Sequence, residues 1–276
     1  MTIAAGLVCP DGIILVADGE VTHTYVKSAK VKLFECREIS EHITIIGAGA
    51  GDDLFIDTVT QKLGEQLDTN TPDLVSVKQE IEKIVLRACQ DAWPLYDTGK
   101  KPDLQILLAI KAVDGLGFFE INGPLVRGVS EYACIGYGTD LAIYKHKHLF
   151  MPRLPLELAT PLMVHLIKTV KDNSIYCGGK TSVWVLRHDG TIDVKSDEYI
   201  ERAETAYDAF DLGLSFLTFV LPILRDAEGR LLMDLLAQAA KDNLDKPKLY
   251  EQAHAAIVAV MNAQPKQLPS KTPEPD

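Results

Sequence analysis

The segment Thr2–Glu20, TIAAGLVCPDGIILVADGE, decides the fold because two apolar runs in it flank a turn. The runs are rich in apolar and β-branched residues, which is typical of buried strands, and Pro10-Asp11-Gly12 between them has the residue types of a tight turn. The predicted strands are Ile3–Cys9 and Ile13–Ala17. The chain therefore opens with a predicted β-hairpin. A turn centred on Asp11 would place Asp18 opposite Ala4.

Residues whose side chains could take part in catalysis lie at the open end of this hairpin. In the predicted register Asp18 lies diagonal to Thr2, and strand alternation puts both side chains on one face. A third predicted strand, Ala29–Glu35, contains Lys30 and Lys32, which are two residues apart and so share a face. If this strand lies beside the hairpin, a hydroxyl, a carboxylate and an ammonium group converge.

The rest of the chain alternates between strand and helix patterns. After a fourth predicted strand, 42–50, the aspartates of Gly51-Asp52-Asp53 are expected to cap a helix. The following predicted elements are helices 54–67 and 72–93, strands 104–112, 117–121 and 132–135, helices 139–147 and 156–171, and strands 181–187 and 191–194. This order suits an α+β fold in which two stacked sheets carry helices on both outer faces, a four-layer αββα sandwich.

The C-terminal part differs from this core in composition. We expect a core domain over residues 1–200 and a helical extension over 201–263, where Ala and Leu recur at helical spacing. The last segment, QPKQLPSKTPEPD over 264–276, has four prolines and no apolar periodicity, so it is predicted to be a disordered tail.

Composition narrows the classes of function. The 276 residues are 47% hydrophobic, enough for a sizeable core, and the net charge of −11 disfavours nucleic acid and anionic membranes as partners. The most apolar stretch, Leu212–Leu224, is too short to span a bilayer. The five cysteines form no CxxC pair, which indicates reduced thiols and a cytoplasmic location. We expect no cofactor and no metal, because His146 and His148 alternate with Lys145 and Lys147 and have no further ligand at metal-binding spacing.

Thr2 has a specific chemical meaning directly after the initiator Met1. Removing Met1 would give one residue both a hydroxyl nucleophile and an α-amine with a pKa of about 8, able to accept the hydroxyl proton near neutral pH. A neighbouring lysine would lower that pKa further, and Asp18 would keep the lysine charged and oriented. The small residues Gly47-Ala48-Gly49 allow backbone N–H groups to approach a substrate closely and form an oxyanion hole.

Several segments, taken in order, resemble proteasome β subunits. TIAAGLVCPDGIILVADGEVT is similar to the start of the mature subunits and of the related peptidase subunit of the bacterial ATP-dependent two-component protease, with Thr2 aligned to their N-terminal threonine. KVKLFE matches the pattern that holds the family's catalytic lysine, which maps to Lys32, with Lys30 as the second choice. IGAGAGDD and, from Cys177, CGGKTSVWVLRHDGTIDVKSD resemble two further family segments. The resemblance covers roughly residues 2–200.

The resemblance implies an N-terminal-nucleophile hydrolase of the threonine peptidase type. It assigns Thr2 as nucleophile, supported by Asp18 and Lys32, with Gly49 in the oxyanion segment. It also implies peptide or unfolded-protein substrates, a ring-forming homo-oligomer and an ATP-dependent unfoldase as partner.

The sequence departs from the family around this centre. Gly136-Tyr137-Gly138 stands where the family has Gly-Ser-Gly, Ser174 replaces an aspartate, and Cys177 replaces a serine. In the family these positions support the nucleophile. Two alternatives to a threonine peptidase therefore stay open, a catalytically silent proteasome-like subunit for assembly or binding, and a hydrolase of small amides.

Overall fold

The computed structural model describes residues 2–22, 27–29, 32–40, 43–67, 73–96, 101–149 and 154–206. The chain divides into two compact units, Met1–Glu204 and Thr205–Asp276. The first unit contains everything described below. Beyond residue 206, the predicted helical extension and the predicted tail lie outside the described residues.

One antiparallel sheet is built around the N-terminal hairpin. Its strands lie in the order β10-β1-β2-β11-β12. They are β1 (Ile3–Cys9), β2 (Gly12–Ala17), β10 (Tyr132–Gly136), β11 (Ser182–Arg187) and β12 (Ile192–Val194). The hairpin thus occupies the centre of the sheet, which explains why nearly all of its residues are buried.

The hairpin register differs from the predicted one by one residue. Ala4 pairs with Ala17, and Cys9 pairs with Gly12, so the loop consists of Pro10-Asp11 alone. A two-residue loop is the commonest hairpin connection, and it shifts every partner by one position relative to a turn centred on Asp11. Asp18 consequently lies opposite Ile3, to whose carbonyl its N–H donates at 3.1 Å, and not opposite Ala4.

The second antiparallel sheet has the strand order β5-β6-β7-β8-β9. Its strands are β5 (Leu33–Ser40), β6 (Ile43–Gly51), β7 (Leu104–Ala112), β8 (Gly115–Asn122) and β9 (Leu125–Gly128). The sequence pattern did not predict β9, which is only four residues long. A separate two-stranded ribbon pairs β3 (Glu20–Thr22) with β4 (Lys27–Ala29).

The predicted strand 29–35 was wrong as a single element. Its first residue ends β4, its last three belong to β5, and Lys32 precedes β5. Because β5 pairs with β6, this segment leads into the second sheet and not to an edge of the hairpin. Lys32 therefore reaches the hairpin from the opposite sheet.

Four labelled α-helices flank the sheets, besides a helical segment over the described residues 197–206. They are α1 (Asp53–Gln66), α2 (Leu74–Ala92, followed by the 3-10 turn Trp93–Leu95), α3 (Thr139–Leu149) and α4 (Leu156–Asn173). As predicted, Asp52 caps α1 by accepting a hydrogen bond from the Phe55 N–H at 3.0 Å. None of the described helices is both long enough and apolar enough to cross a membrane.

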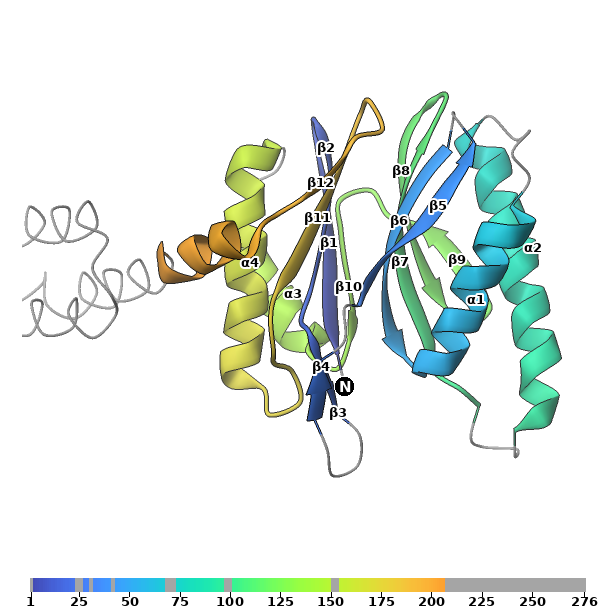
Figure 1. The fold of residues 1–276 in the computed structure, drawn as a ribbon, viewed down its shortest axis with the longest axis horizontal. Coiled ribbons are helices and arrows are strands. Elements are labelled where there is room, and N and C mark those ends of the chain that lie inside the picture. Colours follow the sequence, from blue (N-terminus) through green and yellow to red (C-terminus); the bar gives the residue numbers. More distant parts are fainter. Residues whose placement is uncertain are drawn as a thin grey trace, which may run out of the picture. The chain divides into compact units, whose positions relative to one another are not determined.

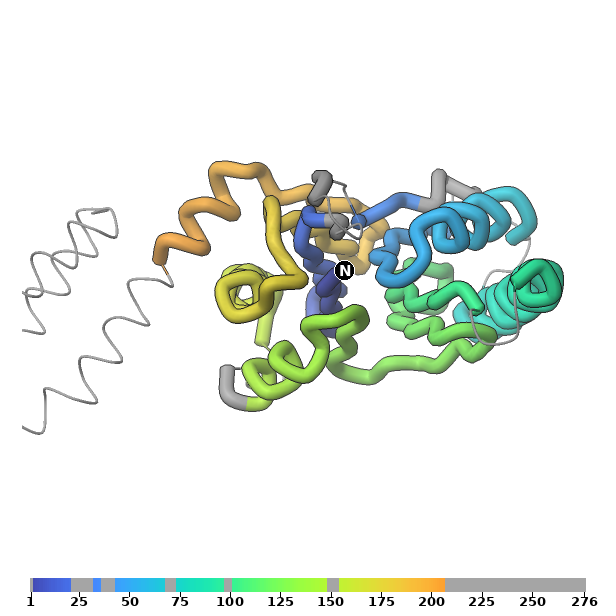
Figure 2. The backbone as a smooth tube through the Cα atoms, turned by 90° about the horizontal axis from the view of Figure 1, so that it is seen from below, coloured from blue at the N-terminus to red at the C-terminus, as the bar shows by residue number. Residues whose placement is uncertain are grey.

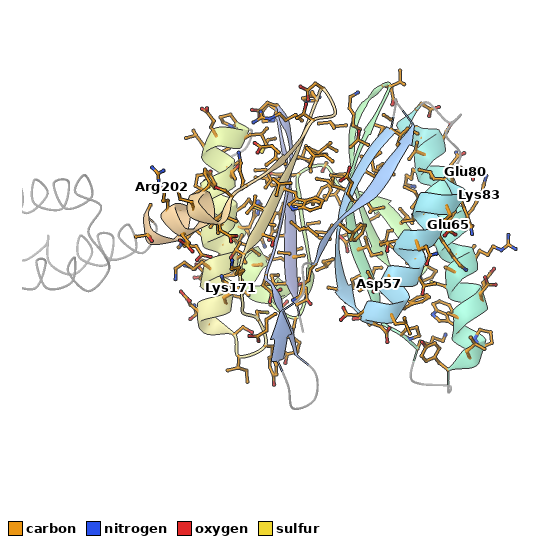
Figure 3. All side chains as sticks on the ribbon, viewed as in Figure 1. Asp57, Glu65, Glu80, Lys83, Lys171 and Arg202 are labelled. Atoms are coloured by element: carbon orange, nitrogen blue, oxygen red, sulfur yellow. The ribbon has the colours of Figure 1, made fainter. Side chains whose placement is uncertain are left out.

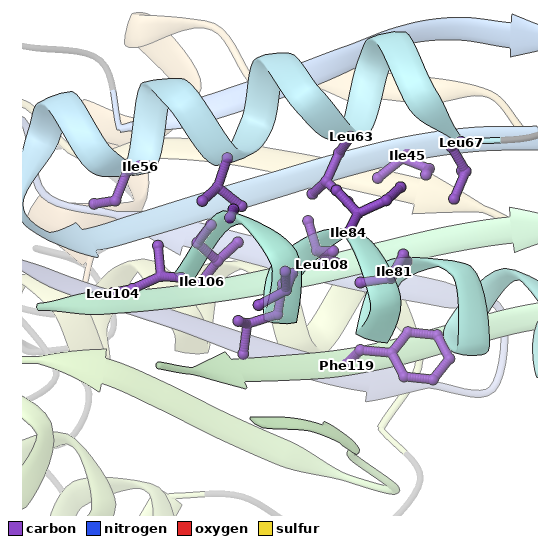
Figure 4. Packing of buried hydrophobic residues seen from close by; sticks show 14 of the residues in the cluster. Ile45, Ile56, Leu63, Leu67, Ile81, Ile84, Leu104, Ile106, Leu108 and Phe119 are labelled. Carbon is purple, nitrogen blue, oxygen red and sulfur yellow. The ribbon is translucent and has the colours of Figure 1, made fainter. Parts of the chain in front are cut away.

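Buried apolar side chains form three clusters that define how the elements pack. One joins α1 and α2 to the second sheet, and Figure 4 shows Leu63, Ile84 and Phe119 among its members. Another joins α3 and α4 to the first sheet. The third lies between the inner faces of the two sheets, where Leu15 and Leu107 are fully buried. Figure 1 shows α1 and α2 on one side of the paired sheets and α4 on the other.

Charged side chains lie on the outer faces of the helices that flank the two sheets. Figure 3 shows Asp57, Glu65, Glu80 and Lys83 on the outward faces of α1 and α2, where Lys83 pairs with Glu80 at 2.5 Å. On the other side of the unit, a helical segment begins at residue 197. Its Glu204 accepts hydrogen bonds from Lys171 at the end of α4 (3.0 Å) and from Thr181 before β11 (2.7 Å). The same lysine ammonium donates to Thr181 at 2.8 Å, so these contacts fix the connection between α4 and β11.

Candidate active site

A buried ion pair lies where the hairpin meets the second sheet. The Lys32 ammonium donates to Asp18 Oδ1 at 2.6 Å, and the two residues are 7% and 1% exposed. The same ammonium also donates to the backbone carbonyl of Glu20. Lys32 precedes β5 and Asp18 follows β2, so the packing of the two sheets brings them together.

Backbone groups satisfy the rest of the Asp18 carboxylate. Oδ1 also accepts from the Ile3 N–H at 3.1 Å, and Oδ2 accepts from the Gly178 N–H at 3.0 Å. Three donors satisfy the buried carboxylate, because they replace the hydrogen bonds of water. Asp18 therefore ties together β1, the segment before β5 and the loop before β11.

Thr2 lies directly beside this pair. It is 9% exposed, and the next residue along the chain, Ile3, donates its N–H to the oxygen that accepts from Lys32. On its other side, the Thr2 carbonyl accepts from the Tyr137 N–H at 2.7 Å. Figure 2 shows the start of the hairpin between the elements of the two sheets. The backbone of Thr2 and Ile3 is thus held beside the carboxylate and the ammonium. The predicted shared face was wrong, because Asp18 lies opposite Ile3 and strand alternation gives Ile3 the other face from Thr2.

Burial governs the charge state of Lys32. Desolvation lowers the pKa of its ammonium below the ordinary value of 10.5, and the adjacent carboxylate of Asp18 opposes this effect. A lysine whose pKa is lowered but which keeps a carboxylate partner provides a fixed positive charge and can exchange a proton more readily than a solvated lysine. Both properties suit the activation of a neighbouring hydroxyl and amine.

The loop between α4 and β11 forms one wall of the site. Cys177 is 4% exposed, and burial raises the pKa of its thiol, while the charges of both Asp18 and Lys32 act on it. Its N–H donates to the Ser174 carbonyl at 3.4 Å. Ser174 also accepts, through its hydroxyl, from the Tyr176 N–H at 3.3 Å. Ser174 therefore shapes the loop, and Cys177 lies within the electrostatic influence of the ion pair.

The turn Gly136-Tyr137-Gly138 forms the opposite wall. Gly136 has φ +94°, and a Cβ there would collide with the carbonyl of Thr2. A Cβ on Gly138 would press on Ile3 at 3.1 Å. Only glycines permit this close approach, which places Tyr137 against the start of β1.

The predicted oxyanion donor is occupied in this structure. The Gly49 N–H, in β6, donates to the carbonyl of Lys32 at 3.2 Å. A Cβ on Gly49 would meet Ile56 of α1 at 2.7 Å, so the glycine is required for packing as well. Its role as an oxyanion donor to a substrate stays a prediction. For that role the hydrogen bond to Lys32 would have to open, or the N–H would have to be shared between both acceptors.

Comparison with known proteins places this arrangement in a structural context. The chain matches no protein-family model, and no curated protein sequence matches it significantly. Among solved structures, Anbu (ancestral beta-subunit) from Yersinia bercovieri superposes with a TM-score of 0.67 at 15% identity, over 81% of this chain and 99% of that one. The chain has the fold of Anbu.

Two further Anbu structures, both from Hyphomicrobium sp. strain MC1, agree with this result. One superposes with a TM-score of 0.62 at 15% identity, covering 77% of this chain and 97% of that one. A Gly-1 mutant gives a TM-score of 0.65 at 16% identity, over 78% and 97% of the two chains. The Anbu likeness supports the proteasome-subunit-like fold expected from the sequence, and at this identity it concerns the fold alone.

Sequence reasoning selected most of this site but missed its backbone donors. Thr2, Asp18, Lys32 and Cys177 converge, whereas Lys30 lies outside the described residues. The N–H groups of Ile3 and Gly178 were not predicted as partners of Asp18, because backbone donors carry no residue-type signal. The aromatic pair of the exposed Tyr137 and the half-buried Tyr176 was also missed, and the position of Tyr137 between two glycines was its only signal.

A cavity of about 770 Å³ opens between β10, β9 and α3. Gln105, in its wall, accepts the Gly136 N–H at 2.9 Å and so connects the cavity to the turn beside Thr2. The buried Glu120 pairs with Arg127 in the same wall. The residues of the buried ion pair do not line this cavity, so we regard it as separate from the candidate catalytic centre.

Proposed function

We propose that this chain is an N-terminal threonine hydrolase with the four-layer αββα sandwich of N-terminal-nucleophile hydrolases, and that its substrates are peptides. The observation that carries the proposal is the buried Lys32–Asp18 pair, whose carboxylate also holds the residue next to Thr2. A carboxylate in a surface ion pair is hydrated by water, whereas the buried Asp18 carboxylate accepts three hydrogen bonds from the protein. The fold likeness to Anbu supports the proposal independently.

The proposed reaction is acyl transfer to Thr2 and then to water. After removal of Met1, the free α-amine accepts the hydroxyl proton while Oγ bonds to the substrate carbonyl carbon. The C–N bond then breaks, and the amine returns the proton to the departing nitrogen. Water hydrolyses the resulting ester by the same proton path in reverse, which restores the hydroxyl.

Lys32 and Asp18 have separate roles in this scheme. The positive charge of Lys32 lowers the pKa of the nearby α-amine and stabilises the negative charge that develops during attack. Asp18 holds that charge in place, and through the Ile3 N–H it also fixes the backbone that carries the nucleophile. The Gly49 N–H would stabilise the oxyanion once it is released from the Lys32 carbonyl.

Intact mass spectrometry with a peptide epoxyketone tests the proposal. The hydroxyl attacks the ketone and the amine attacks the epoxide, so a stable adduct needs both groups of an N-terminal threonine. We expect loss of Met1 and a single adduct that Thr2→Ala abolishes and Thr2→Ser retains. The matched control Thr60→Ala, on the exposed face of α1, should label as the wild type does. Retained Met1, or a free Thr2 without adduct, would refute the hydrolase proposal.

A catalytically silent subunit is the second candidate, because the Gly49 N–H is already bonded to the Lys32 carbonyl and Tyr137 occupies a position where the resembling family has a serine. In that case Thr2 would be free but unreactive. A third candidate keeps the nucleophile but acts on small amides. Turnover of unfolded polypeptide against small amides separates this activity from a peptidase.

The assembly and location of the protein are part of the same proposal. We propose a ring-forming homo-oligomer that admits substrate delivered by an ATP-dependent unfoldase, in the cytoplasm. The four described cysteines that are resolved as free thiols, Cys9, Cys89, Cys134 and Cys177, are compatible with a reducing compartment. Sedimentation velocity of the full chain tests the assembly, and a monomer at working concentration would contradict it.

A further inference from the structure

We infer that Tyr137 and Tyr176 form a recognition wall beside Thr2 for a large apolar or aromatic side chain next to the scissile bond of the substrate. The inference rests on the proposed function, whose nucleophile it supplies with a specificity. Nothing in the Thr2, Asp18 and Lys32 chemistry selects one side chain over another, so a further element must do so.

The position of Tyr137 follows from its backbone. Its N–H donates to the Thr2 carbonyl at 2.7 Å, and the glycines on both sides of it pack directly against Thr2 and Ile3. The turn therefore cannot move away from the nucleophile without breaking these contacts. The backbone of position 137 is thus held beside Thr2.

Tyr176 approaches from the other wall. Its N–H donates to the Ser174 hydroxyl at 3.3 Å, and Gly178, two residues later, donates to Asp18 at 3.0 Å. The loop that carries Tyr176 is thus attached to the same carboxylate that holds Lys32. Both aromatic residues belong to segments that are bonded to the candidate catalytic centre.

The two rings meet and leave an apolar surface open. Their centroids are 4.3 Å apart at an interplanar angle of 65°, an edge-to-face contact, while Tyr137 remains 60% exposed. The neighbouring Ile175 is 77% exposed and adds aliphatic surface to the same loop. An aromatic ring that serves only the core would be buried. An open ring held at a fixed position beside a nucleophile is suited to contact a ligand.

The chemistry of the pair favours an uncharged side chain. The pKa of the Tyr137 hydroxyl is raised, first because of the neighbouring Tyr176 phenol, so the Tyr137 ring stays neutral in the physiological range. Flat aromatic faces and an aliphatic neighbour gain most from covering another apolar group, and aromatic pairs add an orientational preference. We therefore expect selection for Phe, Tyr, Trp or Leu over Gly.

The test measures the cleavage of two sets of peptides by the full-length protein. One set varies the residue before the scissile bond and the other varies the residue after it, each with Phe, Leu and Gly. In the wild type we expect kcat/KM to favour Phe over Gly by about tenfold in one of the two sets. Tyr137→Ala and Tyr176→Ala should each reduce this ratio toward one, while Tyr137→Phe, which keeps the ring, should preserve it.

Tyr144→Ala is the matched control, because Tyr144 is 59% exposed on α3 and forms no part of the wall. Labelling of Thr2 by an epoxyketone that bears only glycine and alanine separates the two failures. No labelling of the wild type refutes the proposed function, and the recognition wall with it. Labelling combined with equal kcat/KM for Phe and Gly in both sets, or with a ratio unchanged in Tyr137→Ala, overturns the recognition wall alone.

Discussion

Replacing Asp18 by asparagine tests the centre of the site, because one isosteric change removes the charge and keeps the shape. Oδ1 accepts from Lys32 at 2.6 Å and from Ile3 at 3.1 Å, while Oδ2 accepts from Gly178 at 3.0 Å. An amide offers one oxygen and one NH2 group. Whichever way it is oriented, at least one donor in this set faces another donor.

The magnitude follows from two losses. An unsatisfied buried N–H costs about 1–3 kcal/mol. Removing one partner of a buried ion pair costs about 3–5 kcal/mol, and this figure already includes the donors that lose their acceptor. We therefore expect Asp18→Asn to lower the free energy of unfolding by about 3–5 kcal/mol. Asp172→Asn is the matched control, since its pair with Lys168 at 2.7 Å is solvent-exposed and is expected to contribute less than about 1 kcal/mol.

The loss of unfolding free energy in Asp18→Asn should also depend on pH, and the direction of this dependence is set by the protonation of Lys32. Burial lowers its pKa from 10.5, and Asp18 opposes that shift. In Asp18→Asn the pKa of Lys32 falls further, so the unfolded chain binds more protons than the folded chain over a wider window below 10.5. Stability of the variant relative to the wild type therefore rises with pH across that window, as Lys32 becomes neutral.

Urea unfolding followed by circular dichroism, at about pH 6 and about pH 9, measures both effects. We expect an unchanged slope against urea and a midpoint that drops more at the lower pH. If Asp18→Asn were as mild as Asp172→Asn at both pH values, the buried pair would not hold the site together. A cost that increased with pH would contradict the assignment of Lys32 as the group whose charge is left unpaired.

Three further predictions concern other parts of the fold. Gly123→Ala, at φ +54° in open space, should lower the free energy of unfolding by about 1–2 kcal/mol. Gly136→Ala should lower it more, because its Cβ also meets the Thr2 carbonyl. Equal urea midpoints for the two variants would exclude that contact. Burial raises the pKa of Cys9 to about 12, so at about pH 8 about one thiol in ten thousand is ionised, and iodoacetamide should alkylate Cys9 only after denaturation; peptide mass spectrometry would detect modification of the native protein. Asp73 caps α2 by accepting hydrogen bonds from Ser76, and these bonds lower the pKa of Asp73 below 3.8. The wild type should therefore lose stability relative to Asp73→Asn as the pH falls through that range. A pH-independent difference between their urea midpoints would argue against the cap.

The elements of this fold were predictable because local chemistry specifies them. The hairpin followed from Pro10-Asp11-Gly12 between two apolar runs, and the start of α1 followed from its aspartate cap, Asp52. The exact pairing was less predictable. A single residue in the turn shifts the whole register, and the preference for a two-residue loop decided between two patterns that bury almost the same side chains.

The sequence by itself selected the residues that we propose to carry the chemistry, namely Thr2, Asp18 and Lys32, since their segments resemble proteasome β subunits. Only the tertiary structure decided how they meet. Lys32 belongs to the segment before β5, and its approach to Asp18 depends on the stacking of two sheets whose contacts are far apart in the chain. The partners of Asp18 on Ile3 and Gly178 are backbone N–H groups, which every residue except proline possesses, so no residue pattern can signal them. They act here because burial removes water and leaves the carboxylate to be satisfied by whatever donors the folded chain brings within reach.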